Sequence, residues 1–239
     1  MTTRITLILS VITLIAFPRH VHAETLEGVE NRLTGATNKV TSFKANRYTA
    51  TDINMSGVKS ITDDKGTYEM LVKDGKPLWR VDSKTISNVD AGGQKMKTET
   101  TGLMVCDGKF IWSLTDTMGQ KMVTKMKIAD EHAALAGASF FASMKKNYKL
   151  KLLPDETIEG KSAFVIEATP IKRSESDGTT TYYILKDTAL TVKTVTTDAS
   201  GKPITTMRLS DIKINVSIPA NRFTFTPPQG VQVMDLTKQ

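Results

Sequence analysis

The sequence predicts a mainly β fold with helices, an α+β domain built on one curved antiparallel sheet. Turn-forming residues recur about every 8–12 residues through most of the chain, as expected for consecutive antiparallel strands. Apolar residues recur at helical spacing in only two places, residues 25–40 and 130–146. No internal repeat, low-complexity tract or linker divides residues 24–239, so we expect a single domain there.

The first 23 residues have the three parts of a secretory signal. A short basic start ends at Arg4, an uncharged and mostly apolar run follows, and small residues lead to Ala23. The apolar run is shorter than the roughly 20 residues needed to cross a bilayer. We therefore expect a signal peptide over residues 1–23 that is cleaved on export to the periplasm; an uncleaved membrane anchor is the alternative.

Cysteine content and charge narrow the class of protein further. The one cysteine, Cys106, can form no disulfide within the chain, so we expect the domain to be stabilised by its hydrophobic core. Cys106 is also too far from the cut site to be lipidated there, so we expect the domain to be soluble. The net charge is +7, and removing Arg4 and Arg19 with the signal leaves +5. This modest excess favours anionic lipid or an acidic partner protein. The basic residues are dispersed, so we expect no nucleic-acid partner.

The first predicted helix covers residues 25–40. Its apolar positions follow three- and four-residue steps and form one stripe, whereas Gly28 and Gly35 weaken it. The stripe consists of Leu26, Val29, Leu33, Ala36 and Val40.

Short strands separated by turns follow this helix. Asp107-Gly108 is the strongest hairpin signal, and residues 63–66 and 73–77 also have the composition of turns. The strands that we expect are 42–54, 58–62, 67–72, 78–81, 95–101, 103–106, 109–114, 122–128, 149–153, 163–169, 179–186, 190–196 and 203–214.

The second predicted helix interrupts the strands. Asp130 is a suitable N-cap, and Lys145 and Lys146 suit the negative end of the helix. No charged residue occurs from Ala133 to Met144. A helix that is apolar around most of its circumference must be covered on several sides or must lie over an apolar hollow.

The residues that catalysis or metal binding requires are scarce. His132 is the one histidine after the signal, no Gly-x-Ser-x-Gly elbow accompanies it, and one histidine with one cysteine is too few for a zinc site. The carboxylate pairs Asp63-Asp64 and Asp155-Glu156 lie beside turn residues and are expected to be solvated, and we expect Cys106 to be a buried, inert thiol. We predict no catalytic residue, no metal and no cofactor.

The pattern also allows a binding hollow, although composition alone favours a solid core. A sheet of about ten strands must curl, and two helices need not fill its concave side. Ten methionines remain after Met1, and methionine suits adaptable apolar sites, although a solid methionine-filled core is the alternative. An apolar hollow of this kind would hold acyl chains.

Three stretches of the chain resemble the LolA family of periplasmic lipoprotein carriers. Residues 220–231, Ala-Asn-Arg-Phe-Thr-Phe-Thr-Pro-Pro-Gln-Gly-Val, resemble the family's C-terminal signature. Residues 105–109, with Trp112 and Gln120 downstream, resemble its Ser-Asp-Gly-Lys hairpin, tryptophan and glutamine. Residues 31–33 and 40–43 resemble its first helix and the start of its first strand. The resemblance covers most of the chain after the signal, but residues 150–206 agree only in strand pattern.

The resemblance implies an incomplete β-barrel whose helices form a lid over a hydrophobic cavity. It also implies a monomeric carrier that takes lipoproteins, by their acyl chains, from an inner-membrane ABC transporter to an outer-membrane acceptor lipoprotein. Lys76 stands where the family has an arginine before proline that helps to hold the lid, and it lacks the planar fork of arginine. The residues that we expect to line the cavity are Phe43, Trp79, Val81, Trp112, Leu135, Phe140, Phe141 and Met144.

Two other functions compete with the carrier. One is a binding module that senses lipid or mislocalised lipoprotein and regulates an envelope partner, as RseB-like relatives do; those relatives have an additional C-terminal domain. The other is an enzyme that acts on lipid, which the lack of a nucleophile–base pair disfavours.

Overall fold

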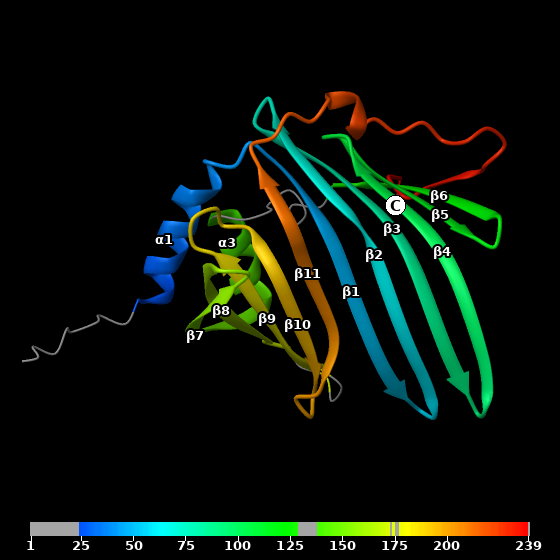
Figure 1. Cartoon of the computed structure of the whole chain (residues 1–239), viewed down its shortest axis with the longest axis horizontal. Coiled ribbons are helices and arrows are strands. Elements are labelled where there is room, and N and C mark those ends of the chain that lie inside the picture. The colour runs from blue at the N-terminus through cyan, green and yellow to red at the C-terminus, as the bar shows by residue number, and fades with distance from the viewer. Residues whose placement is uncertain (1–23, 129–137, 173, 175–176, 239) are drawn as a thin grey trace, which may run out of the picture.

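The computed structural model describes residues 24–128, 138–172, 174 and 177–238 (Figure 1). The predicted signal peptide, residues 1–23, lies outside these ranges. The elements are α1 (Leu26–Thr37), β1 (Ser42–Met55), β2 (Val58–Lys73), β3 (Lys76–Ala91), β4 (Gln94–Cys106), β5 (Phe110–Thr117), β6 (Gln120–Lys127), α3 (Ala138–Asn147), β7 (Tyr148–Ile158), β8 (Lys161–Pro170), β9 (Asp177–Leu185), β10 (Thr191–Asp198), β11 (Pro203–Ile214), the 3₁₀ turn η1 (Ala220–Phe223) and β12 (Val233–Asp235).

In the described ranges the strands form one sheet of twelve, in the order β12-β6-β5-β4-β3-β2-β1-β11-β10-β9-β8-β7. Neighbours are antiparallel except β12 and β6, which are parallel. The sheet is curved and its two outer strands do not pair with each other (Figure 1). The prediction of a mainly β protein with a curved, open sheet is confirmed. Of the residues that the structure describes, none belongs to a helix long and apolar enough to cross a membrane.

The predicted turn at residues 63–66 is wrong, because β2 runs through it without interruption from Val58 to Lys73. Gly66 instead marks a close approach between two strands. A Cβ atom at Gly66 would lie 1.8 Å from the backbone oxygen of Asp82 on β3, so the strand needs glycine there. β3 and β4 are likewise longer than the short strands predicted within them.

The other turn signals that we singled out fall at real turns. Asp74 and Gly75 both have positive φ at the tip of the β2–β3 hairpin. Asp107 organises the β4–β5 connection, because its carboxylate accepts hydrogen bonds from the backbone N–H groups of Lys109 and Phe110 at 2.8 and 2.7 Å. The same carboxylate accepts one from Nε1 of Trp112 at 2.9 Å. A local side-chain bond of this kind makes the sequence signal reliable.

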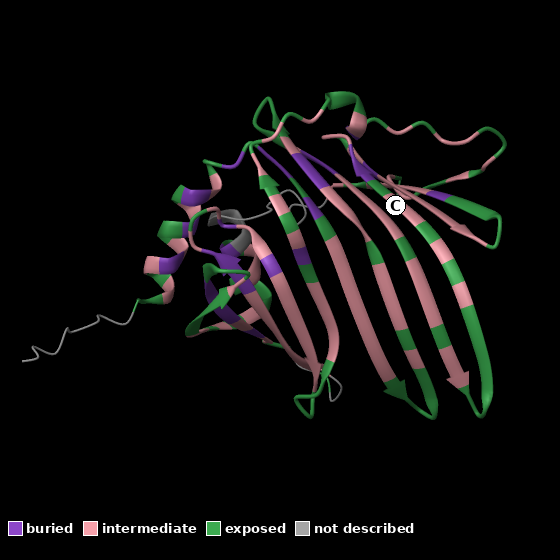
Figure 2. Cartoon of the chain, viewed as in Figure 1, coloured by how far each residue is buried: buried purple, intermediate pink, exposed green. Residues whose placement is uncertain are grey.

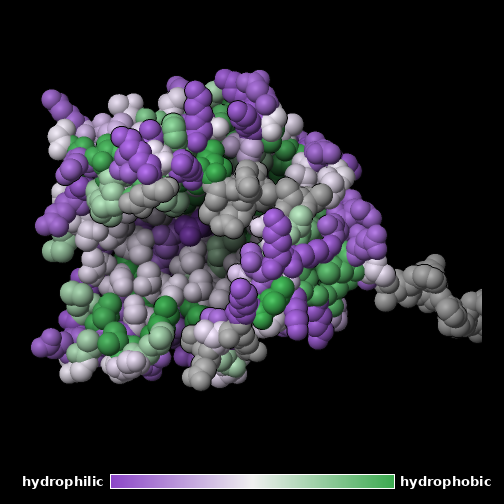
Figure 3. All heavy atoms as spheres, turned by 180° about the vertical axis from the view of Figure 1, so that it is seen from behind, coloured by the Kyte–Doolittle hydropathy of each residue, from purple (hydrophilic) through white to green (hydrophobic). Residues whose placement is uncertain are grey.

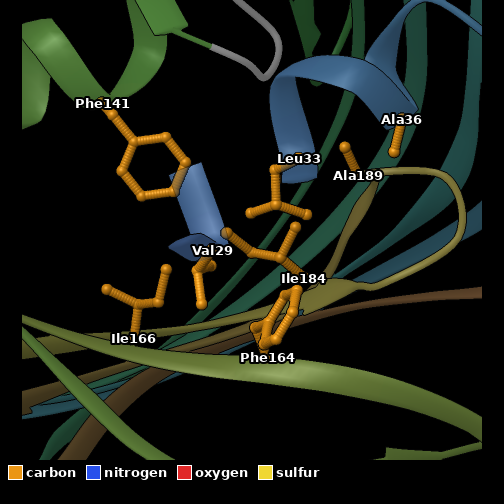
Figure 4. Close-up of a cluster of buried hydrophobic side chains, with 8 residues drawn as sticks. All are labelled: Val29, Leu33, Ala36, Phe141, Phe164, Ile166, Ile184 and Ala189. Carbon is orange, nitrogen blue, oxygen red and sulfur yellow. The ribbon is translucent and has the colours of Figure 1, made fainter. Parts of the chain in front are cut away.

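The two described helices pack together at one end of the sheet. Val29 and Leu33 of α1 and Phe141 of α3 meet Phe164 of β8 and Ile184 of β9 in a closed apolar cluster (Figure 4). An ion pair between Lys145 and Glu30 also joins the helices. The predicted second helix is described only from Ala138 onward. A helical lid over the centre of the sheet is thus not what the described part shows: its helices cover the inner face of β8 and β9.

The C-terminal segment lies on the opposite face of the sheet. Side chains alternate between the two faces along a strand, and Glu69 of β2 and Trp112 of β5 point away from the face that α1 covers. Arg222 of η1 binds Glu69, and Phe225 stacks on Trp112 with ring centroids 5.3 Å apart. Buried residues of β1–β4 gather at the end of the strands that η1 crosses, while the other ends are mostly intermediate, with exposed residues at the hairpin tips (Figure 2).

Candidate functional site

The concave face of the sheet contains a hollow of about 510 Å³ beside the region that the described helices cover. Figure 3 shows this face hollowed, with hydrophilic and hydrophobic residues mixed around the hollow. All of its described lining residues are on strands. They are Arg47, Asp64, Tyr68, Trp79, Val81, Ser83, Thr85, Thr100, Gly102, Leu103, Met104, Ser113, Thr115, Met207 and Leu209.

Small side chains leave this space open. Arg47 of β1 is level with Gly66 of β2, Ser83 of β3, Gly102 of β4 and Thr115 of β5 in the strand register. Residues level with one another on adjacent strands point to the same face. A row of glycine, serine and threonine therefore lies where larger side chains would otherwise fill the concave side.

One end of the hollow is apolar. Trp79 and Val81 of β3 line it together with Tyr68 of β2. Behind them Phe43 packs edge-on against Tyr68, with ring centroids 4.9 Å apart, and closes this end. An alkyl chain entering here would meet aromatic and aliphatic side chains on a surface already held rigid by the core.

The floor of the hollow carries a polar cluster. Nη1 of Arg47 donates to Oδ1 of Asp64 at 2.6 Å, and the hydroxyl of Thr85 donates to Oδ2 of the same carboxylate at 2.7 Å. The Arg47 and Asp64 side chains are 26% and 15% exposed, so the pair is partly desolvated but still reaches the hollow. Charged and hydroxyl-bearing side chains thus share the lining with the apolar ones that we predicted.

Hydroxyl pairs continue the polar surface along the concave face. Thr100 and Thr117 are 2.8 Å apart, and Thr62 and Ser87 are 3.1 Å apart, each pair bridging neighbouring strands. These side chains satisfy one another while keeping hydroxyl groups on the inner face. The hollow thus changes from apolar to hydroxyl-rich along the strands.

Burial changes the chemistry of two groups at the apolar end. It raises the pKa of the Tyr68 hydroxyl, which stays protonated. It also raises the pKa of the Cys106 thiol, whose Sγ lies 3.8 Å from the carbonyl oxygen of Pro77. The prediction that Cys106 is buried is confirmed, because only 2% of the residue is exposed.

The structure brings some of the predicted cavity residues together. Trp79 and Val81 line the hollow, and Phe43 lies one layer behind Tyr68. Trp112 does not belong with them. It points to the opposite face, where it stacks on Phe225, because it is one residue out of register with the inward positions of β5.

The predicted residues of the second helix are placed differently. Phe141 is 1% exposed and packs within the helix cluster, so it is part of the core rather than of the hollow's surface. Met144 is half-buried on α3. Leu135 and the side chain of Phe140 lie outside the described part of the structure. Lys76 is exposed at the tip of the β2–β3 hairpin, in a groove that Asp107 and Asn221 also line, and not beside α1 or α3.

Sequence reasoning missed Arg47 and Asp64. Asp64 was assigned to a turn that does not exist, which removed it from the inward positions of β2. The available signal was alternation: Phe43, Ala45 and Arg47 occupy every second position of β1, so Arg47 shares the face of two buried apolar residues.

Comparisons with known proteins identify the fold more clearly than the function. A protein-family model described only as an uncharacterized protein matches residues 120–226. The uncharacterized protein MJ0687 of Methanocaldococcus jannaschii is 27% identical over 135 residues, which cover 55% of this chain and 37% of that protein. This chain thus spans little more than a third of the length of that curated relative.

Solved structures are similar to this chain at low sequence identity. An uncharacterized conserved protein from Thermus thermophilus is similar with a TM-score of 0.53 and 14% identity, over 87% of this chain and 98% of that one. The Pseudomonas aeruginosa MucA/MucB complex matches with a TM-score of 0.44 and 17% identity, over 83% and 60%. The LolA superfamily protein NE2245 from Nitrosomonas europaea gives 0.32 and 15%, over 85% and 99%. The first of these shows a common fold; the two lower scores carry no argument about function.

Proposed function

We propose that the protein is a non-enzymatic lipid-binding protein of the bacterial envelope that holds an acyl chain in the hollow of its concave face. The single observation that carries this proposal is the hollow itself. It lies on the sheet face bounded by Trp79, Val81 and Tyr68 and is left open by the small residues level with Arg47. Its volume of about 510 Å³ is in the range of small-molecule sites.

Burial of the chain would supply the binding energy. Each methylene group moved from water into an apolar site contributes about 0.8 kcal/mol. Burying about eight methylenes would give about 6 kcal/mol, which corresponds to a dissociation constant of tens of micromolar. Such affinity suits a ligand that is picked up and released again.

Within this class, we favour a periplasmic carrier of lipoproteins. The resemblance of residues 220–231 to the LolA signature and the signal-like residues 1–23 support it. The partners would be an inner-membrane ABC transporter as donor and an outer-membrane lipoprotein as acceptor. A regulatory module that senses lipid, the alternative, would use the same hollow but would bind a signalling partner protein instead.

The two tryptophans allow a sharp test of where a chain binds. Trp79 lines the hollow, whereas Trp112 stacks on Phe225 on the opposite face. We expect a dodecyl chain brominated near its end to quench fluorescence of the Trp112→Phe variant, in which Trp79 remains. The matched Trp79→Phe variant, which keeps Trp112, should show little quenching at the same bound fraction, measured by equilibrium dialysis.

Equal quenching of both variants, or failure of the chain to bind, would contradict the proposed site. Mass spectrometry of the proteins that co-purify with it from the periplasm then separates the two finer functions. Co-purified acylated protein supports the carrier, and a stoichiometric unacylated partner supports the regulatory module.

A further inference from the structure

The hollow contains an arginine that an acyl chain alone does not require. Arg47 and Asp64 are the charged residues among those that line it. Burying a charged group is costly unless it is paired, and an apolar residue at position 47 would suit a hydrocarbon better. The polar cluster therefore needs an explanation beyond chain binding.

The hydrogen bonds of the cluster leave guanidinium N–H donors available. Each oxygen of Asp64 already accepts one hydrogen bond, from Arg47 or from Thr85. Arg47 has five N–H donors, and among the described residues only one of them has a hydrogen-bond partner. A ligand that reaches the cluster thus meets unused guanidinium N–H groups.

The neighbouring lining residues add further donors. Ser83 of β3 and Thr115 of β5 line the same hollow as Arg47, and each hydroxyl can donate one hydrogen bond. Arg47 lies four residues along β1 from Phe43, about 13 Å at the rise of a β-strand. A head group at Arg47 would therefore leave its chain pointing along Val81 and Trp79 toward the closed apolar end.

We propose that Arg47 binds the head group of the ligand. The hollow would then select amphiphiles that combine an alkyl chain with an oxyanion. This inference rests on the proposed acyl-chain binding and not on a lipoprotein cargo, whose ester- and amide-linked chains carry no oxyanion. A carboxylate and a phosphate present the same chemistry to a guanidinium, whose planar fork pairs two N–H donors with two oxygens of either group. A free fatty acid and a phospholipid are the two sources of that chemistry.

The test compares probes that share one chain and differ in the head group. Dodecanoate, dodecyl phosphate and dodecanol would be titrated into the purified protein by calorimetry, below their micellar concentrations. We expect both anions to bind about tenfold more tightly than the alcohol, the factor that one charge-assisted hydrogen bond of about 1.4 kcal/mol gives. Tighter binding of dodecanoate points to a fatty acid as the source, and tighter binding of dodecyl phosphate points to a phospholipid.

Two substitutions in the cluster should act in opposite directions. Arg47→Gln should abolish the preference for the anions over dodecanol. Asp64→Asn removes the carboxylate that competes for the guanidinium, so it should widen the preference by several fold. Arg208→Gln is the matched control, because Arg208 is exposed on β11, paired with Tyr48, on the opposite face.

The outcomes separate the inference from the function on which it rests. If wild-type protein binds dodecanol as tightly as the anions, or if Arg47→Gln keeps the preference while remaining folded by circular dichroism, the head-group role is overturned and chain binding stands. If no probe binds to the wild type, both proposals are overturned. A preference that Arg208→Gln also abolishes would show a general charge effect and would likewise overturn the inference.

Discussion

Arg222 and Glu69, 153 residues apart in the chain, form a close ion pair in which Nε and Nη2 of Arg222 each lie 2.9 Å from Oε2 of Glu69. Nζ of Lys44 lies 2.8 Å from the other carboxylate oxygen. The Glu69 side chain is only 4% exposed. Its two cations therefore compensate a buried charge, and one of them ties the C-terminal segment to the outer face of the sheet.

We expect Glu69→Gln to lower the free energy of unfolding by about 2 kcal/mol, because it removes charge-assisted hydrogen bonds from a buried site. Urea unfolding followed by circular dichroism measures the change. Glu99→Gln is the control, since the Lys84–Glu99 pair is more than half exposed on both sides and such pairs contribute about 0–1 kcal/mol. An equal effect of both substitutions on the free energy of unfolding would show that the burial of Glu69 does not increase its contribution to stability.

The same carboxylate predicts an acid dependence of stability. Burial acts to raise the pKa of Glu69, but hydrogen bonds from Lys44 and Arg222 and their positive charges outweigh it and hold the pKa below its ordinary value. The unfolded chain therefore takes up this proton first as the pH falls. The stabilisation is complete above the ordinary glutamate pKa of about 4.3 and is lost as the pH falls through the lowered folded value. The stability difference between wild type and Glu69→Gln should be constant from about pH 7 to 5 and shrink below about pH 4; a difference that grows in acid would contradict the lowered pKa.

Gly66→Ala should be strongly destabilising. The added Cβ would lie 1.8 Å from the backbone oxygen of Asp82, so β2 and β3 would have to move apart at a cost of about 3 kcal/mol. Gly35→Ala is a control of opposite sign: nothing lies within 4 Å of its Cβ, and alanine in a helix interior is favoured over glycine by about 0.5–1 kcal/mol. Thermal unfolding of both variants measures the effects. A neutral Gly66→Ala would show that the close approach of the two strands does not depend on glycine.

Phe141 should matter for stability and not for chain binding. It is buried among Val29, Leu33 and Ile166 in the cluster that joins α3 to α1 and β8. Phe141→Ala should lower the free energy of unfolding by about 3 kcal/mol through the cavity that it leaves. Chain affinity, measured by dialysis at a temperature where the variant is folded, should stay within about threefold of wild type. A loss of affinity greater than tenfold would place this side chain at the binding surface after all.

The sequence predicted the class of fold because turns and alternation are local signals. The turns at Asp74-Gly75 and Asp107-Gly108 were placed correctly, since positive φ and side-chain capping are properties of the turn residues themselves. Residues 63–66 also have the composition of a turn, but they lie within β2. There Gly66 is required by its close approach to Asp82 on the next strand, and the local sequence pattern contains no information about that approach.

The candidate site was predicted only in part for a related reason. Trp79 and Val81 were found through a family resemblance, and they do line the hollow. Trp112 was assigned to the same surface, but one residue of register puts it on the other face. Arg47 and Asp64 are neighbours because β1 pairs with β2, and their separation in the sequence does not indicate this. The width of the space between these residues and β5 depends on the curvature of the whole sheet.

The short parallel pairing of β12 with β6 has a consequence for how the protein behaves at high concentration. Val233, Met234 and Asp235 cover part of the outermost strand on that side, and the N–H of Leu236 adds one more bond to Lys125. On the other rim, β7 presents exposed Lys149 and Lys151. Unpaired strand rims otherwise template fibre growth between molecules, and a short covering strand or lysines discourage it. A wide, open sheet is thus protected at both rims against joining its own copies edge to edge.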